Sequence, residues 1–319
     1  MANILVTVTN FNERCADAKR YMQAQGHKVF VSDAKLRRLS PAEIRPIVED
    51  MDAAIIGMDV WNAAMFDLAP RLRAVAKFGV GVDNIDLAEA RRRGIYAINA
   101  AGANAAAVAE IAITLMVGAL RNVASLNRDL LGGRWTRFLG EDLCGKTVGL
   151  IGFGSIARRV ARVLRAMDAR VIVYKRTPAP ELAAQYDVEF LPLGEVISGC
   201  DILSLHIPGA ADTQKLMNEK TFAMMKKGSV IVNTARGCLI DEEALLRALE
   251  SGQILAAGLD VFDPEPPAKE SPLLHHPRVF ALPHTGGETV EAYANAGMSV
   301  ARSVCQALAG EEPDCWVNR

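Results

Sequence analysis

The chain has 319 residues, of which 50% are hydrophobic and 23% charged, and its formal net charge is −1. This length exceeds one typical domain, so we expect two domains, and the apolar content is enough for two buried cores. A nearly neutral chain has no overall field that would attract nucleic acid or an anionic membrane surface, and we expect neither as a partner.

The sequence shows no targeting or membrane pattern. Its first residues lead directly into an apolar strand pattern without a basic leader, so no signal peptide is expected. The longest apolar run, at residues 111–120, contains Thr114 and Gly118 and is too short to cross a bilayer. The six cysteines are scattered without metal-like spacing. We therefore expect free thiols, no metal site and a cytoplasmic location.

Residues 1–100 alternate short apolar runs with segments of helical periodicity, which indicates a parallel sheet covered by helices. Strands are predicted at residues 4–9, 28–32, 53–57, 74–78 and 96–99, and helices at residues 12–25, from residue 40 onwards and at 87–93. The second helix should begin at Ser40, because this serine precedes a proline at the first helical position and a glutamate at the third.

A long, alanine-rich helix is predicted at residues 103–131 and ends at Gly132 and Gly133. Its polar side chains come late in the segment. A helix this apolar is expected to be buried, either between the domains or in a subunit interface, and the sequence leaves both positions open.

A strand, a glycine turn, a helix and a second strand follow one another at residues 147–176. The predicted strands are residues 147–151 and 171–174, and a segment of helical spacing separates them. The turn at residues 152–157 matches G-x-G-x-x-G/A, with alanine in the last position. This setting, between a strand and an amphipathic helix, predicts a dinucleotide-binding site.

Each small residue of this turn has a mechanical role. Gly152 allows the sharp turn, Gly154 lets the backbone approach a pyrophosphate, and Ala157 lets the helix pack close to the strand. Ser155 and Ile156 lie at the helix N-terminus, where free N–H groups can bind the phosphates.

Three loops in the second half of the chain carry groups suited to catalysis. Further strands are predicted at residues 202–206, 230–234, 256–259 and 279–282, and a last helix at 287–310. Arg236, Glu265 and His284 each lie in the loop after one of the last three strands. Because ligands bind at the carboxyl ends of parallel strands, the three loops can converge on one crevice. Alone, each residue could instead be an ordinary surface or structural group.

Together with a glycine-rich loop at residues 78–86, these motifs resemble the D-2-hydroxyacid dehydrogenase family, which includes D-3-phosphoglycerate dehydrogenase, glyoxylate/hydroxypyruvate reductase and D-lactate dehydrogenase. The resemblance covers nearly the whole chain. It implies an α/β fold of two Rossmann-like domains with doubly wound parallel sheets, the cofactor domain being inserted in the substrate domain. The substrate (catalytic) domain would comprise residues 1–100 and 287–319, and the dinucleotide-binding domain residues 101–286. A homodimer through the cofactor domain is also implied.

The resemblance assigns roles to individual residues. The family's catalytic histidine falls on His284, its paired acid on Glu265 and its substrate-binding arginine on Arg236. Its carboxylate-binding backbone loop falls on Val80 and Gly81. Further family positions beside the cleft are Asn104 on the substrate side and, on the cofactor side, His206, Pro208, Thr234, Ala235, Asp260 and Gly286, with Asp260 orienting the nicotinamide. Lys77 precedes the carboxylate loop and either adds positive charge to it or lies on the surface.

The chemistry of these groups suits reduction of a 2-keto acid, which requires a hydride at the carbonyl carbon and a proton at its oxygen. Histidine, whose pKa is near neutrality, can transfer that proton in either direction. A carboxylate against its other nitrogen fixes the tautomer and favours the charged form. Arginine can hold a carboxylate and a developing oxyanion in a forked geometry that lysine lacks.

An NAD-specific site usually has an acid at the end of the second strand, hydrogen-bonded to the ribose 2′-hydroxyl. Here that strand is followed by Lys175, Arg176 and Thr177. Two cations and a hydroxyl suit a 2′-phosphate, so we predict a preference for NADP(H) over NAD(H). The alternative is that both cations point into solvent and both cofactors are used.

The expected function is a nicotinamide-dependent dehydrogenase or reductase of a small D-2-hydroxy or 2-keto acid, with hydroxypyruvate, glyoxylate and phosphoglycerate as leading substrates. The chain ends soon after its last predicted helix, so no C-terminal regulatory domain is expected. Two alternatives share the fold. One is a dinucleotide-sensing scaffold that resembles the C-terminal binding protein corepressors, and the other is a phosphite dehydrogenase-like oxidoreductase.

Overall fold

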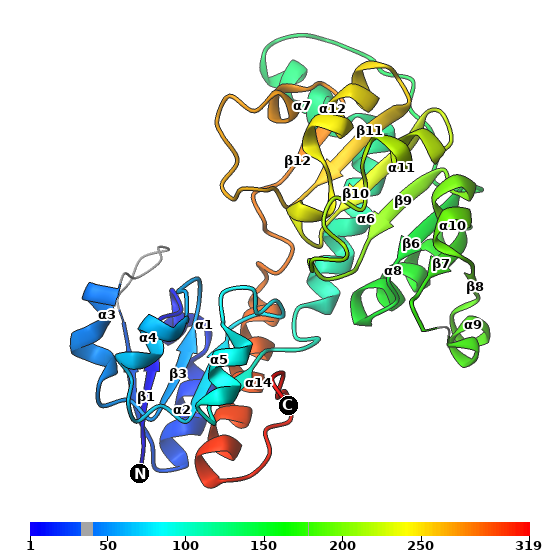
Figure 1. Ribbon diagram of the computed structural model, residues 1–319. Coiled ribbons are helices and arrows are strands. Elements are labelled where there is room, and N and C mark those ends of the chain that lie inside the picture. The colour runs from blue at the N-terminus through cyan, green and yellow to red at the C-terminus, as the bar shows by residue number, and fades with distance from the viewer. Residues whose placement is uncertain (33–40, 178) are drawn as a thin grey trace. The chain divides into compact units, whose positions relative to one another are not determined.

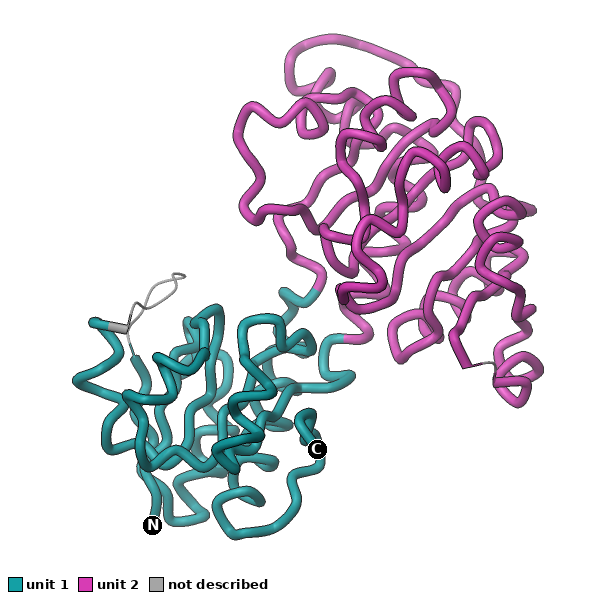
Figure 2. The backbone as a smooth tube through the Cα atoms, viewed as in Figure 1, with its two compact units in different colours: residues 1–104, 287–319 teal, residues 105–286 magenta. Residues whose placement is uncertain are grey.

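The protein is described by a computed structural model that covers residues 1–32, 41–177 and 179–319. The chain divides into two compact units (Figure 2). Unit 1 comprises residues 1–104 and 287–319, and unit 2 comprises residues 105–286. Unit 2 is therefore one continuous insertion in the sequence of unit 1, and each unit has a parallel sheet and its own hydrophobic core.

The sheet of unit 1 has five parallel strands in the order β2-β1-β3-β4-β5 (Figure 1). The strands are β1 (Asn3–Val6), β2 (Lys28–Val31), β3 (Ala53–Ile56), β4 (Ala74–Lys77) and β5 (Tyr96–Ile98). The helices are α1 (Phe11–Arg14), α2 (Ala16–Ala24), α3 (Pro41–Val48), α4 (Ala63–Asp67), α5 (Leu87–Arg92) and α14 (Val290–Ala309). All five predicted strands are confirmed, with shifts of a few residues at their ends.

Two predicted helices of unit 1 are present with changed bounds. The helix predicted at residues 12–25 is interrupted at Cys15, whose φ of −127° and ψ of 32° separate α1 from α2. The helix predicted to start at Ser40 is present as α3, which begins at Pro41, but Ser40 itself lies outside the described residues.

The last helix, α14, completes the core of unit 1. It begins after Thr289, whose side chain accepts a hydrogen bond from the N–H of Ala292, and it ends at Gly310, which has a positive φ of 84°. It packs on α2 and β4 and buries Val300 and Val304 in the same core as the strands. The helix predicted at residues 287–310 is thus confirmed.

The sheet of unit 2 has seven parallel strands in the order β12-β11-β10-β9-β6-β7-β8. The strands are β6 (Thr147–Ile151), β7 (Arg170–Tyr174), β8 (Glu189–Phe190), β9 (Ile202–Leu205), β10 (Ser229–Asn233), β11 (Ile254–Leu259) and β12 (Val279–Ala281). The helices are α6 (Ala105–Arg121), α7 (Val123–Leu131), α8 (Ser155–Ala166), α9 (Pro180–Tyr186), α10 (Leu193–Gly199), α11 (Glu219–Met224), α12 (Glu242–Glu250) and α13 (Pro272–His275), with a 3-10 turn η1 (Gly237–Leu239).

This strand order creates a topological switch point. From β6 the chain proceeds outwards to β7 and β8, and then returns to β9 on the other side of β6. In such sheets ligands bind outside the carboxyl ends of the strands where the direction reverses, because the two loops diverge and leave a crevice. The switch point lies between the ends of β6 and β9, which are followed by Gly152 and His206.

The single helix predicted at residues 103–131 is wrong. Its two parts, α6 and α7, meet at Asn122, which has the left-handed φ of 54° that asparagine tolerates better than most residues. The helices bend by 69° there, and α6 lies in the core of unit 2 whereas α7 has no buried residue. Among the described residues no single helix is long and apolar enough to cross a membrane, although this bent pair passes such a test taken together.

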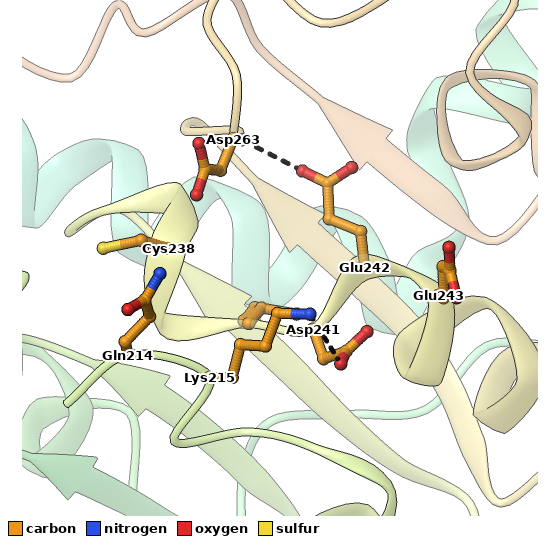
Figure 3. Close-up of a pocket in the computed structure, with 8 residues that line it drawn as sticks. Gln214, Lys215, Cys238, Asp241, Glu242, Glu243 and Asp263 are labelled. Atoms are coloured by element: carbon orange, nitrogen blue, oxygen red, sulfur yellow. Dashed lines mark hydrogen bonds and ion pairs between the residues drawn. The ribbon is translucent and has the colours of Figure 1, made fainter. Parts of the chain in front are cut away.

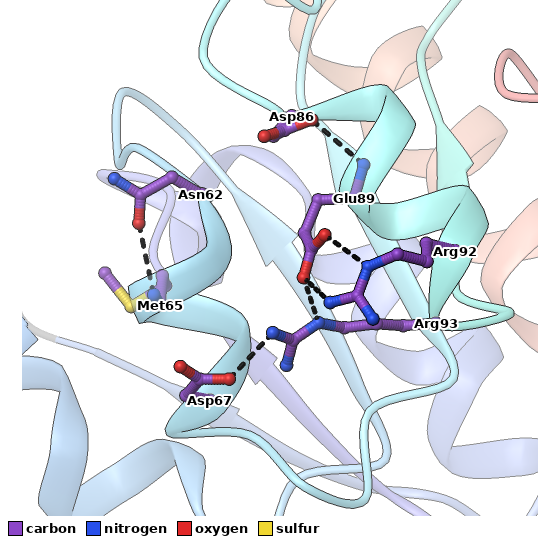
Figure 4. A network of polar contacts seen from close by, with 7 residues as sticks. All are labelled: Asn62, Met65, Asp67, Asp86, Glu89, Arg92 and Arg93. Carbon is purple, nitrogen blue, oxygen red and sulfur yellow. Dashed lines mark hydrogen bonds and ion pairs between the residues drawn. The ribbon is translucent and has the colours of Figure 1, made fainter.

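A polar network joins α4 to α5 on unit 1 (Figure 4). Glu89 accepts hydrogen bonds from Arg92, with 2.8 Å between Oε2 and Nε, and from Arg93, with 2.7 Å between Oε1 and Nε. Arg93 also donates to Asp67 of α4 at 2.7 Å. These hydrogen bonds lower the pKa of Glu89 to about 2.

We predict that Glu89→Gln removes part of the acid sensitivity of unit 1. Because the pKa of Glu89 is lowered in the folded state, its contribution to stability is present above its ordinary pKa and is lost as pH falls towards 2. Thermal unfolding, followed by fluorescence of the buried Trp61, should therefore show a smaller loss of stability between pH 5 and pH 2 in this variant. Glu49→Gln, at an exposed position of unit 1, is the control, and parallel curves for wild type and Glu89→Gln would contradict the prediction.

Candidate active site

The glycine turn after β6 lies against the end of β9. Gly152 has a φ of 97°, and its N–H donates to the carbonyl of Tyr174 at 2.8 Å. A Cβ atom at this position would lie only 2.4 Å from the carbonyl oxygen of His206. Both the backbone conformation and the close contact therefore require glycine here.

The start of α8 has the features of a phosphate site. Gly154 is the N-cap residue of α8, and a Cβ atom built on it would meet nothing within 4 Å. The helix then starts at Ser155 and Ile156, and the N–H groups of its first turn have no partner within the helix. Ala157 is fully buried against the sheet, as its small size predicts. Open space before a row of N–H donors fits a dinucleotide pyrophosphate.

The residues after β7 lie on the surface. Lys175 donates from Nζ to the carbonyl of Thr177 at 2.7 Å. Arg176 pairs with Asp212 at 2.6 Å, and the side chains of both are largely exposed. Each cation thus has a local partner within unit 2, and each is accessible to solvent.

Arg236 lies in a turn that a buried asparagine organises. Asn233, the fully buried last residue of β10, donates from Nδ2 to the carbonyl of Arg236 at 2.8 Å and accepts from the N–H of Ala235 at 3.0 Å. Arg236 itself donates from Nη1 to the carbonyl of Ala235 at 2.6 Å. The neighbouring hydroxyl of Thr234 is buried without a hydrogen-bond partner. Asn233 was not among the predicted site residues, although its position at the end of a strand before the motif is a usable signal.

The predicted histidine and acid form a hydrogen-bonded pair. Nδ1 of His284 lies 2.7 Å from Oε2 of Glu265, and the other carboxylate oxygen accepts from the N–H of Phe262 at 3.0 Å. About half of the His284 side chain is exposed, and about a third of Glu265. The opposite ring nitrogen of His284 is consequently available for a substrate.

The pair changes the acidity of both groups. The hydrogen bond that His284 donates to Glu265 raises the pKa of His284 above its ordinary value, in spite of partial burial and of the nearby Arg236. Burial raises the pKa of Glu265, but the bonds from His284 and from the backbone of Phe262, with the charge of Arg236, bring it below its ordinary value. Arg236 thus acts electrostatically on both members of the pair.

Asp260 fixes the loop that carries the histidine. Its side chain is 1% exposed and accepts hydrogen bonds from the N–H groups of Thr285 and Gly286, each at 2.8 Å. His284 has a φ of 54°, a left-handed conformation that costs energy for a residue with a side chain. The two bonds to Asp260 follow directly and hold that conformation.

His206 differs from His284 in its surroundings. Burial lowers the pKa of His206 to about 4, and its Nε2 lies 3.0 Å from the hydroxyl of the buried Ser204. It is therefore neutral near pH 7, at the end of β9 beside Gly152. Pro208 lies two residues after His206, and the carbonyl of Pro208 accepts from the hydroxyl of Thr213 at 3.0 Å.

The predicted substrate residues all belong to unit 1. The ammonium of Lys77 donates to the carbonyl of Gly57. Val80 is 39% exposed, and its carbonyl accepts a hydrogen bond from the side chain of Asn99 at 2.7 Å. The next residue, Gly81, is half-buried. The side-chain oxygen of Asn104 is buried without a hydrogen-bond partner.

Residues 113–286 match the family described as D-isomer specific 2-hydroxyacid dehydrogenase, NAD binding domain. The match covers more than half of the chain and includes the glycine turn, Arg236, Glu265 and His284. The chain therefore belongs to the D-isomer specific 2-hydroxyacid dehydrogenases, and unit 2 contains its nicotinamide-dinucleotide-binding domain.

Individual relatives agree with this assignment. Over 265 residues the chain is 44% identical to chloroplastic D-3-phosphoglycerate dehydrogenase 3 of Arabidopsis thaliana, a match that covers 82% of this chain and 44% of the relative. The chain spans about half the length of the curated relatives it matches.

Solved structures match over almost the full length. A protein from Thermus thermophilus is 33% identical, with a TM-score of 0.89 and 99% of both chains covered. The NADPH-dependent glyoxylate/hydroxypyruvate reductase of Sinorhizobium meliloti is 29% identical, with a TM-score of 0.86, 99% of this chain and 98% of that chain covered. The predicted fold of two Rossmann-like α/β units is thus confirmed.

We predict opposite behaviour for two alanine substitutions in the glycine turn. Gly152→Ala should lower stability by about 1–3 kcal/mol through backbone strain and the contact with His206. Gly154→Ala should leave the melting temperature unchanged, because its Cβ meets open space, but should weaken dinucleotide binding about tenfold or more. Thermal unfolding and calorimetric titration with NADH and NADPH measure the two effects. Wild-type affinity in Gly154→Ala would show that no phosphate lies against this residue.

Proposed function

We propose that the protein interconverts small 2-keto acids and D-2-hydroxy acids with a nicotinamide cofactor, and that hydroxypyruvate, glyoxylate and phosphoglycerate are its leading substrates. The observation that carries the proposal is the pairing of His284 with Glu265 at 2.7 Å, under the charge of Arg236, within the dinucleotide-binding unit. Relatives named as phosphoglycerate dehydrogenase and as glyoxylate/hydroxypyruvate reductase support the choice of substrates.

His284 serves as the acid in reduction and as the base in oxidation. The bound nicotinamide supplies or accepts the hydride. Glu265 holds the proton on Nδ1, so the opposite nitrogen, Nε2, faces the substrate oxygen and donates a proton to it during reduction. The carboxylate of Glu265 stabilises the protonated imidazole before the substrate binds. The same hydrogen bond orients the neutral imidazole for the reverse reaction.

Carboxylate-binding groups are proposed in each unit, Arg236 in unit 2 and the loop at Val80 and Gly81 in unit 1. The guanidinium offers a fork of N–H donors to the carboxylate and to the carbonyl oxygen, where negative charge develops. In unit 1 the backbone N–H groups of Val80 and Gly81 are the proposed donors to a carboxylate. Asn104, whose buried side-chain oxygen has no hydrogen-bond partner, is a further proposed substrate residue of unit 1, and Lys77 adds positive charge before the loop.

The central prediction is that His284→Gln lowers kcat/KM for keto-acid reduction about 10²- to 10⁴-fold, the usual contribution of a general acid. A panel of 2-keto acids, assayed by oxidation of NADPH and NADH, measures this. The variant should bind the dinucleotide as the wild type does. Full activity in His284→Gln would refute the proposed chemistry, and so would a wild type that reduces no keto acid. An inactive wild type would favour a dinucleotide-sensing scaffold or phosphite oxidation. The same assay with phosphite and NAD(P)+ distinguishes these two alternatives.

The pH dependence has a sign that follows from the raised pKa of His284. Reduction needs the protonated imidazole, so its kcat/KM should be constant below that pKa and should fall above it. Oxidation of the hydroxy acid needs the neutral imidazole and should rise over the same range. Glu265→Gln removes the group that raises the pKa, so both limbs should move to lower pH.

We propose NADP(H) as the preferred cofactor. Lys175, Arg176 and Thr177 follow β7 in place of the acid that usually binds an unmodified ribose, and a structurally similar relative is NADPH-dependent. Arg176 pairs with Asp212 at the surface, and its largely exposed side chain is accessible to a ligand.

We predict that Arg176→Ala lowers kcat/KM with NADPH about tenfold, since it removes a charged hydrogen bond to the 2′-phosphate, and changes kcat/KM with NADH little. Arg170→Ala is the matched control, because Arg170 lies at the opposite end of β7 in an exposed pair with Glu189. Equal effects of Arg176→Ala on the two cofactors would contradict a 2′-phosphate contact.

We also propose a homodimer formed through unit 2. The side chains of Leu130 and Leu131 on α7, and of Trp135 and Leu139 in the following segment, are more than half exposed. Large apolar side chains that gather in one segment at this exposure favour association with another protein surface. The expectations of no nucleic-acid partner, no membrane partner and a cytoplasmic location stay predictions.

A further inference from the structure

The loop that carries Glu265 has few backbone donors of its own. Within the run from Phe262 to Glu265, Pro264 has no N–H, and Pro266, which also lacks one, follows Glu265. The N–H of Phe262 donates to Oε1 of Glu265 at 3.0 Å, so the acid is held by its own loop. The next N–H along the chain, that of Asp263, donates to a residue outside the loop.

That residue is Glu242, the first residue of α12. Its Oε1 accepts from the N–H of Asp263 at 3.1 Å (Figure 3). Two adjacent peptide groups of one loop are thus held by two carboxylates. Glu265 holds the first and is itself bonded to His284, while Glu242 holds the second and is anchored on a helix.

The helix is a firm anchor. Asp241 caps α12 by accepting from the N–H of Ala244 at 3.2 Å, and Lys215 pairs with Asp241 at 3.1 Å. Leu245 on the inner face of α12 is fully buried in the core of unit 2. Glu242 itself borders a cavity of about 270 Å³ whose lining also includes Cys238 and Asp263, and burial raises its pKa.

The same loop is confined from the arginine side. Gly237 follows Arg236, and a Cβ atom on it would lie 2.0 Å from the carbonyl carbon of Phe262 and 2.6 Å from the nitrogen of Asp263. The turn after Arg236 therefore packs directly on the peptide between Phe262 and Asp263. Steric contact blocks motion towards Gly237 only, and the hydrogen bond to Glu242 adds a restraint on the same peptide, beside the buried side chain of Phe262.

We propose that Glu242 is a positioning residue, which holds the loop of Asp263 in register so that Glu265 stays within hydrogen-bond distance of His284; this inference rests on the proposed function of that pair. The acceptor oxygen, rather than the negative charge, carries the effect. Glu242 touches neither the substrate nor the cofactor in this proposal, and it acts only through the loop.

The test measures the protonation of His284 directly. The charged groups that face this imidazole are Glu265, Asp260 and Arg236. If the loop drifts, Glu265 moves away and the pKa of His284 falls towards its ordinary value. NMR titration of labelled histidine, with the signal assigned by His284→Gln, should show a fall of about half a pH unit or more in Glu242→Ala. In the same variant kcat/KM for reduction should fall about ten- to hundredfold, with its alkaline limb moved to lower pH.

Glu242→Gln keeps the acceptor oxygen and should behave as the wild type in both measurements. Glu243→Gln is the matched control, because Glu243 is the next residue of α12 and its side chain is 89% exposed. Glu242→Asp keeps the charge, but its side chain is one methylene too short to reach the N–H of Asp263, so this variant should resemble Glu242→Ala. If circular dichroism shows that Glu242→Ala is unfolded, Glu242→Asp tests the positioning role in its place.

Two results would overturn the inference. One is an unchanged His284 pKa in the folded Glu242→Ala or Glu242→Asp variant, and the other is an equal fall in Glu242→Gln, which would assign the effect to charge. If the His284 pKa falls as expected but the wild type reduces no keto acid, the positioning role stands and the proposed function fails.

Discussion

The acid–base chemistry proposed for unit 2 depends on one hydrogen bond, that between Nδ1 of His284 and Oε2 of Glu265. Its two residues come from loops after different strands, β12 and β11, which are adjacent in the sheet. A bond of this kind fixes a tautomer only if both loops keep their positions. Much of the polar organisation at this edge of unit 2 serves that end, because Asp260 holds the histidine loop and Asn233 accepts the N–H of Asp260 through its carbonyl at 2.9 Å.

The dinucleotide turn and this pair share the same edge of a single sheet. Parallel strands align all their carboxyl ends, so Gly152 after β6, Arg236 after β10 and His284 after β12 belong to one row of loops. The order of the strands then decides which loops diverge. The reversal between β6 and β9 opens the place for a dinucleotide, and the loops after β10, β11 and β12 carry the groups that we propose for acid–base chemistry. The fold therefore supplies the geometry, and side chains at the strand ends supply the chemistry.

Prediction from sequence was accurate where burial dictates the pattern. Strands such as β6 and β10 are covered on both faces and appear as continuous apolar runs, so their positions could be predicted. The break at Asn122 could not, because apolar residues resume at Val123 directly after it and the left-handed φ is a property of one residue. The pairing of His284 with Glu265 was predicted through a family motif, whereas Glu242 looked like any acidic residue in the first turn of a helix. Its contact with Asp263 depends on tertiary structure, which no local pattern encodes.

The left-handed backbone of His284 explains why so many neighbours are involved. A residue with a Cβ adopts this conformation at a cost of about 1 kcal/mol or more, and would relax if its loop were free. The N–H groups of Thr285 and Gly286 donate to the buried side chain of Asp260, and relaxation of the loop would break both hydrogen bonds and leave buried polar atoms without partners. The imidazole is half exposed and has little packing of its own. Its position is therefore set by the backbone on which it stands, and its charge by the carboxylate that the neighbouring loop presents to it.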